Sequence, residues 1–187
     1  MSPLPDTEEN VVTRWFGAGF AQLDPLLQRL HRRGGSLAGD IEIRIGNGIA
    51  GSFGRQLARA LNLPIDRRVR GFEVRIGHTE SSLIWARRFD NGAEMVSVFE
   101  PVGAWPEGYW LERTGPLTLR LTVDIDDGGW RWLPLGVSWR GIALPRGLMP
   151  SSDAYKRVES GRYLFHVAFS LPGIGPVLSY GGTLDAR

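Results

Sequence analysis

The sequence predicts a mainly β protein, a strongly curved antiparallel sheet or partly open β-barrel of about ten strands with N-terminal helices and one short helix covering an end. Between residues 37 and 184, short segments alternate apolar and polar side chains. Such alternation gives each strand one face for a core and one for water. Turn residues separate the segments, as in hairpins. A sheet this long must curl or close to protect its edges.

The chain begins with helical segments. Apolar residues in 11–33 follow the helical period rather than the strand period. Pro25 disfavours helical geometry in Asp24, so we predict two helical pieces, the second running from Pro25 to Arg32. Gly34 then ends that helix.

The remaining elements are strands, with one helical interruption. A strand at Leu37 to Ile45 is followed by a helix at about Ile49 to Leu61. Hairpin residues stand at 90–92 and 126–129, which makes consecutive strands antiparallel neighbours. A longer loop is predicted at Gly141 to Pro150. The later strands are predicted at Val69 to Ile76, Ser82 to Phe89, Glu94 to Glu100, Tyr109 to Arg113, Leu117 to Ile125, Trp130 to Arg140, Ala154 to Glu159, Tyr163 to Ser170 and Val177 to Leu184.

Length and composition indicate one soluble domain. The chain has 187 residues, 42% hydrophobic and 22% charged, and we predict a flexible N-terminus at 1–10 and a single barrel-like domain at 11–187. No apolar run reaches the length of a membrane span, and the acidic start does not resemble a signal peptide, so we expect a cytoplasmic protein. The net charge of +2 is scattered along the chain, which argues against a nucleic-acid partner.

Cysteine and lysine usage narrows the chemistry. The chain has no cysteine, which excludes disulfides, zinc thiolate sites and cysteine nucleophiles. Of the 22 basic residues only Lys156 is a lysine. The excess of arginine reflects either codon bias or arginine forks that bind acidic groups. We expect no cofactor and no metal site.

A glycine motif suggests dinucleotide binding but lacks the right context. Gly46, Gly48 and Gly51 form G-x-G-x-x-G, and Asp66 follows at the distance of a ribose-binding acid. The preceding strand alternates charged residues, however, whereas the first strand of a doubly wound sheet is continuously apolar. We therefore interpret the motif as a glycine-rich turn before a packing helix.

The three histidines have structural interpretations. His31 stands near the end of the second helical piece, where the helix dipole favours a cation. His78 is predicted in an exposed polar turn. His166 stands on the strand face opposite Phe165 and Val167, so it faces outward or into a polar lumen. None has metal-ligand spacing.

Aromatic and charged residues share faces of three strands. Trp85 and Arg87 are two positions apart and so share one face of a strand. Glu112 is a predicted partner of Arg87, either in a ligand cavity or in a structural ion pair at the barrel rim. Trp130 and Trp132 share a face, while the opposite face carries Leu133, Leu135, Val137 and Trp139. The predicted ligand-binding residues are Trp85, Arg87, Glu112, Arg113, Trp130 and Trp132.

Several short motifs, taken in order, resemble the bacterial DUF4166 family. They include Trp85, Arg87 and Phe89, the corner Glu112, Arg113, Gly115 and Pro116, the loop from Leu144 to Pro150, the strand Phe165, His166 and Val167, and the closing Tyr180, Gly182 and Leu184. The resemblance spans about Phe16 to Leu184. It implies a stand-alone or fused domain, sometimes attached to saccharopine-dehydrogenase-like enzymes, and it supplies no catalytic residues.

Three functional hypotheses remain open. The first is a non-catalytic module that binds a hydrophobic or amphiphilic, lipid-like small molecule, with tryptophan walls and with Arg87 and Arg113 holding an acidic head against Glu112. The second is an enzyme or enzyme subunit working beside a dehydrogenase-like partner, with Glu112 or His31 as proton donor. The third is a protein interaction domain that uses surface tryptophans.

Overall fold

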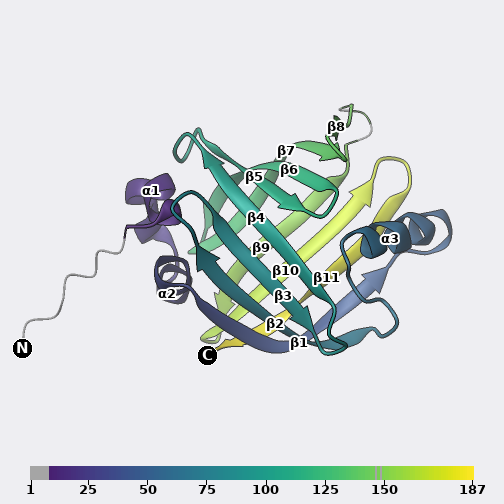
Figure 1. Ribbon diagram of the computed structural model, residues 1–187, viewed down its shortest axis with the longest axis horizontal. Helices are drawn as coiled ribbons and strands as arrows, with labels where there is room; N and C mark the ends of the chain where they lie inside the picture. Colours follow the sequence, from purple (N-terminus) through teal and green to yellow (C-terminus); the bar gives the residue numbers. More distant parts are fainter. Residues whose placement is uncertain (1–8, 146, 148) are drawn as a thin grey trace, which may run out of the picture.

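The strands pair in an order that closes the sheet on itself (Figure 1). The computed structural model describes residues 9–145, 147 and 149–187. The hydrogen-bonded order is β6-β5-β4-β3-β2-β1-β11-β10-β9-β7, and an additional β6–β7 pairing joins the two ends. The strands are β1 (Gly35–Ile45), β2 (Val69–His78), β3 (Leu83–Phe89), β4 (Glu94–Val102), β5 (Tyr109–Thr114), β6 (Leu117–Asp126), β7 (Gly129–Trp139), β8 (Ile142–Ala143), β9 (Ser151–Glu159), β10 (Arg162–Leu171) and β11 (Gly175–Ala186).

The fold class predicted from the sequence is confirmed. Ten strands form a closed antiparallel barrel, and each corresponds to one of the ten predicted segments. The short β8 lies in the predicted loop at 141–150, where it pairs with the end of β7. The one-domain prediction remains a prediction, and most of its flexible segment, residues 1–8, lies outside the described residues.

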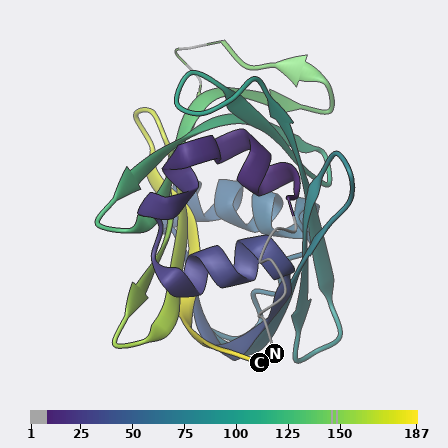
Figure 2. The same ribbon diagram turned by 90° about the vertical axis from the view of Figure 1, so that its left-hand side faces the viewer.

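Helices cover the two ends of the barrel. The α1 helix (Val11–Phe16), the 3₁₀ helix η1 (Gly17–Gln22) and α2 (Pro25–Arg33) cross one end, and α3 (Gly48–Ala60) lies at the other (Figures 1 and 2). Two backbone hydrogen bonds connect the first group to strand loops: Asp24 N–H donates to Gly128 C=O at 2.9 Å, and Trp105 N–H donates to Trp15 C=O at 2.8 Å. No helix in the described part of the chain is long and apolar enough to cross a membrane.

Local sequence explains the N-terminal helices. Asn10 caps α1 in a reciprocal capping box with Thr13. Pro25 is the first residue of α2, and the Asp24 carboxylate accepts a hydrogen bond from Leu26 N–H at 2.7 Å. The Asn10 side-chain amide also donates to the carbonyl of His31 at 2.9 Å. This bond connects the start of α1 to the end of α2 and so helps to position His31.

The glycines before and within α3 allow close packing. A Cβ on Gly54 would lie 2.0 Å from the Val177 carbonyl oxygen of β11, and one on Gly46 would lie 2.3 Å from that of Pro176. A Cβ on Gly51 would lie 2.3 Å from the Gly46 carbonyl oxygen. Gly46 and Gly54 thus allow the turn and α3 to lie against β11, and Gly51 allows the helix to pack on the turn, in agreement with the interpretation as a turn before a packing helix.

Candidate functional site

An aromatic cluster occupies the interior near the α1 and α2 end. Trp130 and Trp132 of β7 have ring centroids 5.0 Å apart, and Trp132 stacks on Phe99 of β4 at 5.5 Å with an interplanar angle of 9°. Trp85 of β3 lies 6.3 Å from Phe99. Phe16 packs on the cluster from α1 in an edge-to-face contact with Trp130, with ring centroids 4.7 Å apart. Period-two alternation on three strands therefore brings these rings to one interior.

Lys156 of β9 lies inside this cluster. It pairs across the β7–β9 ladder with Trp130, so both side chains are on the inner face. Its Nζ lies 3.5 Å from the Trp130 ring centroid, 4.5 Å from that of Trp85 and 5.6 Å from that of Trp132. Only 2% of the residue is exposed. The single lysine of the chain is thus an interior group surrounded by three tryptophan rings.

His31 reaches Lys156 from the end of α2. It is fully buried, stacks on Trp85 at 6.0 Å and has its Nε2 3.0 Å from Lys156 Nζ. Burial, then the charges of Lys156 and His78, lower the pKa of His31 well below its usual value. The interpretation of His31 as a helix-terminal cation is therefore wrong, because a neutral imidazole is favoured in this desolvated position.

A polar chain crosses the interior from β3 to β5. Arg87 Nη1 donates to Ser97 Oγ at 2.7 Å, and Arg87 Cζ lies 5.4 Å from the Trp85 ring centroid. Glu112 Oε1 lies 2.9 Å from Ser97 Oγ and accepts from Thr114 Oγ1 at 3.1 Å. The carboxylate thus compensates the buried guanidinium through one intervening hydroxyl.

A small cavity lies beside the lysine and the polar chain. Its volume is about 60 Å³, and its lining includes Trp85, Arg87, Glu112 and Lys156. One water needs roughly 10–15 Å³ of such space, so there is room for about four to six waters. The cavity can hold the polar head of a small ligand but not a whole acyl chain.

A larger apolar space, which we call the vestibule, lies at the α3 end of the barrel and has a volume of about 320 Å³. It shares Leu117, Leu119 and Phe169 with the lining of the small cavity. The vestibule is lined by Phe53, Gln56, Leu57, Leu117, Leu119, Val137, Trp139, Leu144, Pro150, Phe169, Leu171 and Val177. The small cavity, which has a few polar groups in a mostly apolar lining, and the apolar vestibule are therefore adjacent and share these three side chains as walls.

Five of the six predicted site residues come together in the interior: Trp85, Arg87, Glu112, Trp130 and Trp132. Arg113 does not join them. It is 49% exposed and forms an ion pair with Glu100 on the outer face of the barrel. Because Glu112 and Arg113 are consecutive on β5, they point to opposite faces.

The predicted faces of β7 are wrong for Val137 and Trp139, because a β-bulge interrupts the alternation before them. The register between β6 and β7 shifts between Arg120 and Leu121, where Leu121 pairs with Pro134 and Arg120 with Gly136. The extra residue reverses the alternation, so Val137 and Trp139 line the vestibule instead of sharing the outer face with Leu133 and Leu135.

Two interior polar residues, Lys156 and Ser97, lie outside the site predicted from the sequence. Lys156 lies between the inward positions Ala154 and Val158, a pattern that could have identified it as an interior lysine. Ser97 lies in the same way between Met95 and Phe99. The signal in both cases is a polar residue on the apolar face of a predicted strand.

The remaining histidines lie apart from this cluster. His78 ends β2 and is half-buried instead of exposed, and burial lowers its pKa. His166 packs against Tyr155, with ring centroids 5.6 Å apart. Tyr155 and His166 alternate with the inward residues Lys156 and Phe165, which directs their side chains to the outer face, and both residues also contribute to the lining of the small cavity.

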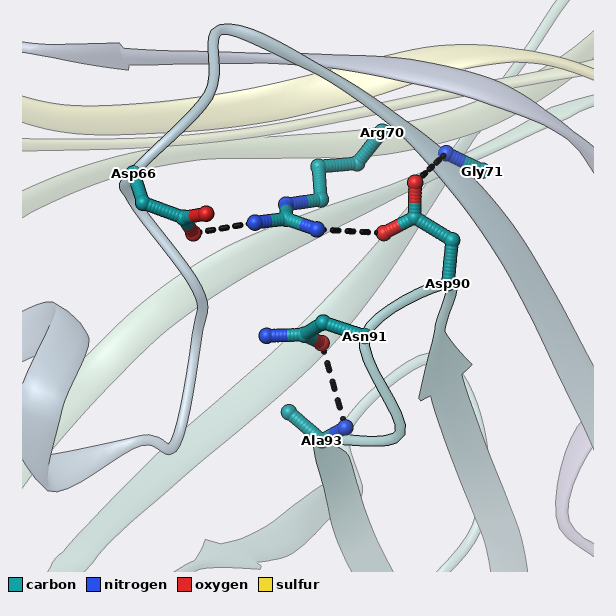
Figure 3. A network of polar contacts seen from close by, with 6 residues as sticks. All are labelled: Asp66, Arg70, Gly71, Asp90, Asn91 and Ala93. Atoms are coloured by element: carbon teal, nitrogen blue, oxygen red, sulfur yellow. Dashed lines mark hydrogen bonds and ion pairs between the residues drawn. The ribbon is translucent and has the colours of Figure 1, made fainter.

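Asp66 has a structural partner outside the barrel (Figure 3). Arg70, which is 3% exposed, donates to Asp66 and, at 2.5 Å, to Asp90. Gly71 N–H donates to the second oxygen of Asp90 at 3.3 Å. Hydrogen bonds from Arg70 lower the pKa of both carboxyl groups. Asp66 therefore fixes the segment before β2 to the β3–β4 hairpin.

The fold and its interior define a closed antiparallel barrel with a large buried aromatic cluster, an architecture consistent with ligand binding. The model of a domain of unknown function, DUF4166, matches residues 23–184. The chain therefore belongs to the DUF4166 family, as the resemblance in its sequence indicated. A comparison with curated proteins gives no match.

Proposed function

We propose that the barrel is a non-catalytic binding module for an amphiphilic small molecule with an apolar tail and an acidic head. The small cavity and the vestibule share Leu117, Leu119 and Phe169 in their linings, and this adjacency of the two spaces carries the proposal. The tail would occupy the vestibule, where eleven of the twelve lining residues are apolar. The head would occupy the cavity, which is too small for more than a polar group.

Arg87 supplies the attraction for an acidic head. Arg87 is buried and lines the cavity, and among the described residues its guanidinium donates a side-chain hydrogen bond to Ser97. A guanidinium has five N–H donors, so Arg87 retains donors for a carboxylate. Arg113, which the sequence analysis placed beside it, cannot contribute because it lies on the outer face.

The interior disfavours the two alternative hypotheses. Glu112 already accepts hydrogen bonds and acts as counter-charge to Arg87, which suits an ionised carboxylate better than a proton donor. His31, whose pKa is lowered, is neutral near pH 7 and therefore lacks the imidazolium proton that a proton donor would supply. All seven tryptophans lie in the described ranges and none is exposed, which removes the main support for an interaction domain based on surface tryptophans.

Octanoate binding to delipidated protein tests the proposal. A ligand at about 100 times its Kd stabilises the folded state by about 2.7 kcal/mol, which corresponds to roughly 5–10 °C in Tm for a chain of this size. We expect Arg87→Gln to remove this shift and Arg113→Gln, the matched outer-face control, to retain it. Gln56→Trp, at the exposed rim of the vestibule, should weaken binding by narrowing the tail site. An octanoate-independent Tm in the wild-type protein would refute the proposal.

A further inference from the structure

The buried Lys156 amine lies beside the imidazole of His31, an arrangement that noncovalent binding of a ligand does not require. We propose that Lys156 condenses with the keto group of a 2-oxo acid with an apolar tail, forming an imine inside the barrel with His31 as proton acceptor. This inference rests on the proposed function, because it assigns a ligand class to the same cavity and vestibule. It adds a covalent step at a named atom.

Lys156 has a base as its neighbour instead of an acid. Its Nζ lies 3.0 Å from His31 Nε2, and none of the ion pairs among the described residues includes it. Buried lysines that serve only structure are normally paired with a carboxylate. Lys156 also lines the cavity, so a ligand head in the cavity would lie beside its side chain.

The surroundings favour a neutral, nucleophilic amine. Burial and the charge of Arg87 lower the pKa of Lys156 well below its usual value, although Glu112 acts in the opposite direction. The faces of Trp130 and Trp85 attract a cation, but such contacts are weaker than the desolvation of a fully buried ammonium. Because His31 lies at hydrogen-bond distance, protonation of both groups at once is unfavourable. A neutral amine is the form that attacks a carbonyl carbon.

The chemistry balances without a further reagent. The amine nitrogen attacks the keto carbon, and His31 accepts the proton that the nitrogen loses as the carbinolamine forms. The former keto oxygen takes one proton from solvent to become the carbinolamine hydroxyl, and the imidazolium returns its proton to that hydroxyl, which leaves as water. The second nitrogen proton then passes to solvent and replaces the one that solvent supplied. One C=O bond and two N–H bonds are replaced by one C=N bond and one water molecule.

Three neighbouring regions match the three parts of such a ligand. Arg87 and Lys156 both lie against Trp85, with Cζ 5.4 Å and Nζ 4.5 Å from its ring centroid. Both residues also line the same cavity of about 60 Å³, so a carboxylate bound by Arg87 would leave the adjacent keto carbon in the small space that Lys156 borders. The tail would extend past Leu119 and Phe169 into the vestibule.

Reductive trapping tests the imine directly. The full-length protein is incubated at neutral pH with 2-oxooctanoate and sodium cyanoborohydride, and the product is analysed by intact mass and peptide mapping. Because the chain has one lysine, only the α-amino group of Met1 competes, and peptide mapping separates the two sites. We expect one reduced adduct on Lys156, and none with octanoate, which lacks the keto group.

Variants separate covalent capture from binding. Lys156→Arg and Lys156→Met should lose the adduct, and octanoate should still raise the Tm of whichever variant folds. As a control for ordinary amine reactivity, Arg75→Lys in the Lys156→Arg background presents a lysine at a site that is 78% exposed. That lysine should react at least about tenfold more slowly at neutral pH, because its amine is almost fully protonated. His31→Gln should slow trapping at Lys156 by about tenfold or more and remove the His31 inflection from the pH profile.

The outcomes distinguish the two proposals. Absence of a Lys156 adduct, with an octanoate-dependent Tm retained, would overturn the imine and leave the proposed function intact. Equal trapping at the exposed control lysine would also overturn it. An adduct at Lys156 without any effect of octanoate would support the imine and refute noncovalent binding of acidic amphiphiles.

Discussion

Lys156→Met is predicted to change how stability depends on pH. The lowered pKa of Lys156 means that the unfolded chain binds a proton that the folded protein does not, over the range from that lowered value up to about 10.4. In this range the free energy of unfolding rises with pH by about 1.4 kcal/mol per unit. The variant lacks the titrating amine and should lose this slope.

The slope separates protonation from packing. Methionine also removes the contact with His31 and changes the fit among the tryptophan rings, and both effects shift the stability at every pH by a similar amount. The other groups that face the amine, Arg87 and Glu112, are present in both proteins, as is Tyr163, whose pKa is raised by burial. Differences between the two slopes therefore report the lysine.

Urea unfolding followed by tryptophan fluorescence measures this effect. Free energies of unfolding are determined for both proteins at intervals between about pH 7.5 and pH 9.5, above the usual pKa of histidine and below that of tyrosine. Where the range lies above the lowered pKa of Lys156, we expect the stability difference between variant and wild type to change by about 1.4 kcal/mol per pH unit. Parallel pH dependences would show that Lys156 remains protonated in the folded protein, which would refute the reasoning.

The other predictions concern the helix contact, the outer face and the polar chain. Gly54→Ala should lower the free energy of unfolding by about 1–3 kcal/mol, because the new methyl group would meet the Val177 carbonyl oxygen. The control Gly77→Ala, whose methyl group would lie in open space, should be no less stable than the wild type in chemical denaturation. Arg113→Ala should change stability by less than about 1 kcal/mol and leave octanoate affinity unchanged in calorimetry, since its ion pair is exposed. Glu112→Gln should remain folded by circular dichroism but lose about 1–3 kcal/mol, because Arg87 loses its counter-charge; unchanged stability would contradict that role.

Local patterns in the sequence determined the secondary structure and much of the sidedness. Alternation depends only on the two-residue period of a strand, so Trp85 and Arg87 could be assigned to one face without knowledge of any partner strand. The same rule places Arg113 opposite Glu112 and, on β9, Lys156 among inward residues. These two assignments were available in the sequence, although the predicted site did not use them.

Pairing between distant segments decided the closure of the barrel, the inward face of β7 after the bulge and the contact between His31 and Lys156. The β6–β7 pairing closes the barrel, and the bulge within it turns Val137 inward, which no local pattern reveals because one extra residue reverses every later side chain. His31 and Lys156 are 125 positions apart and meet only because α2 covers the end of the barrel near β9. The strands followed from the sequence, whereas the contact between imidazole and amine required the closed tertiary structure, because it depends on where α2 docks.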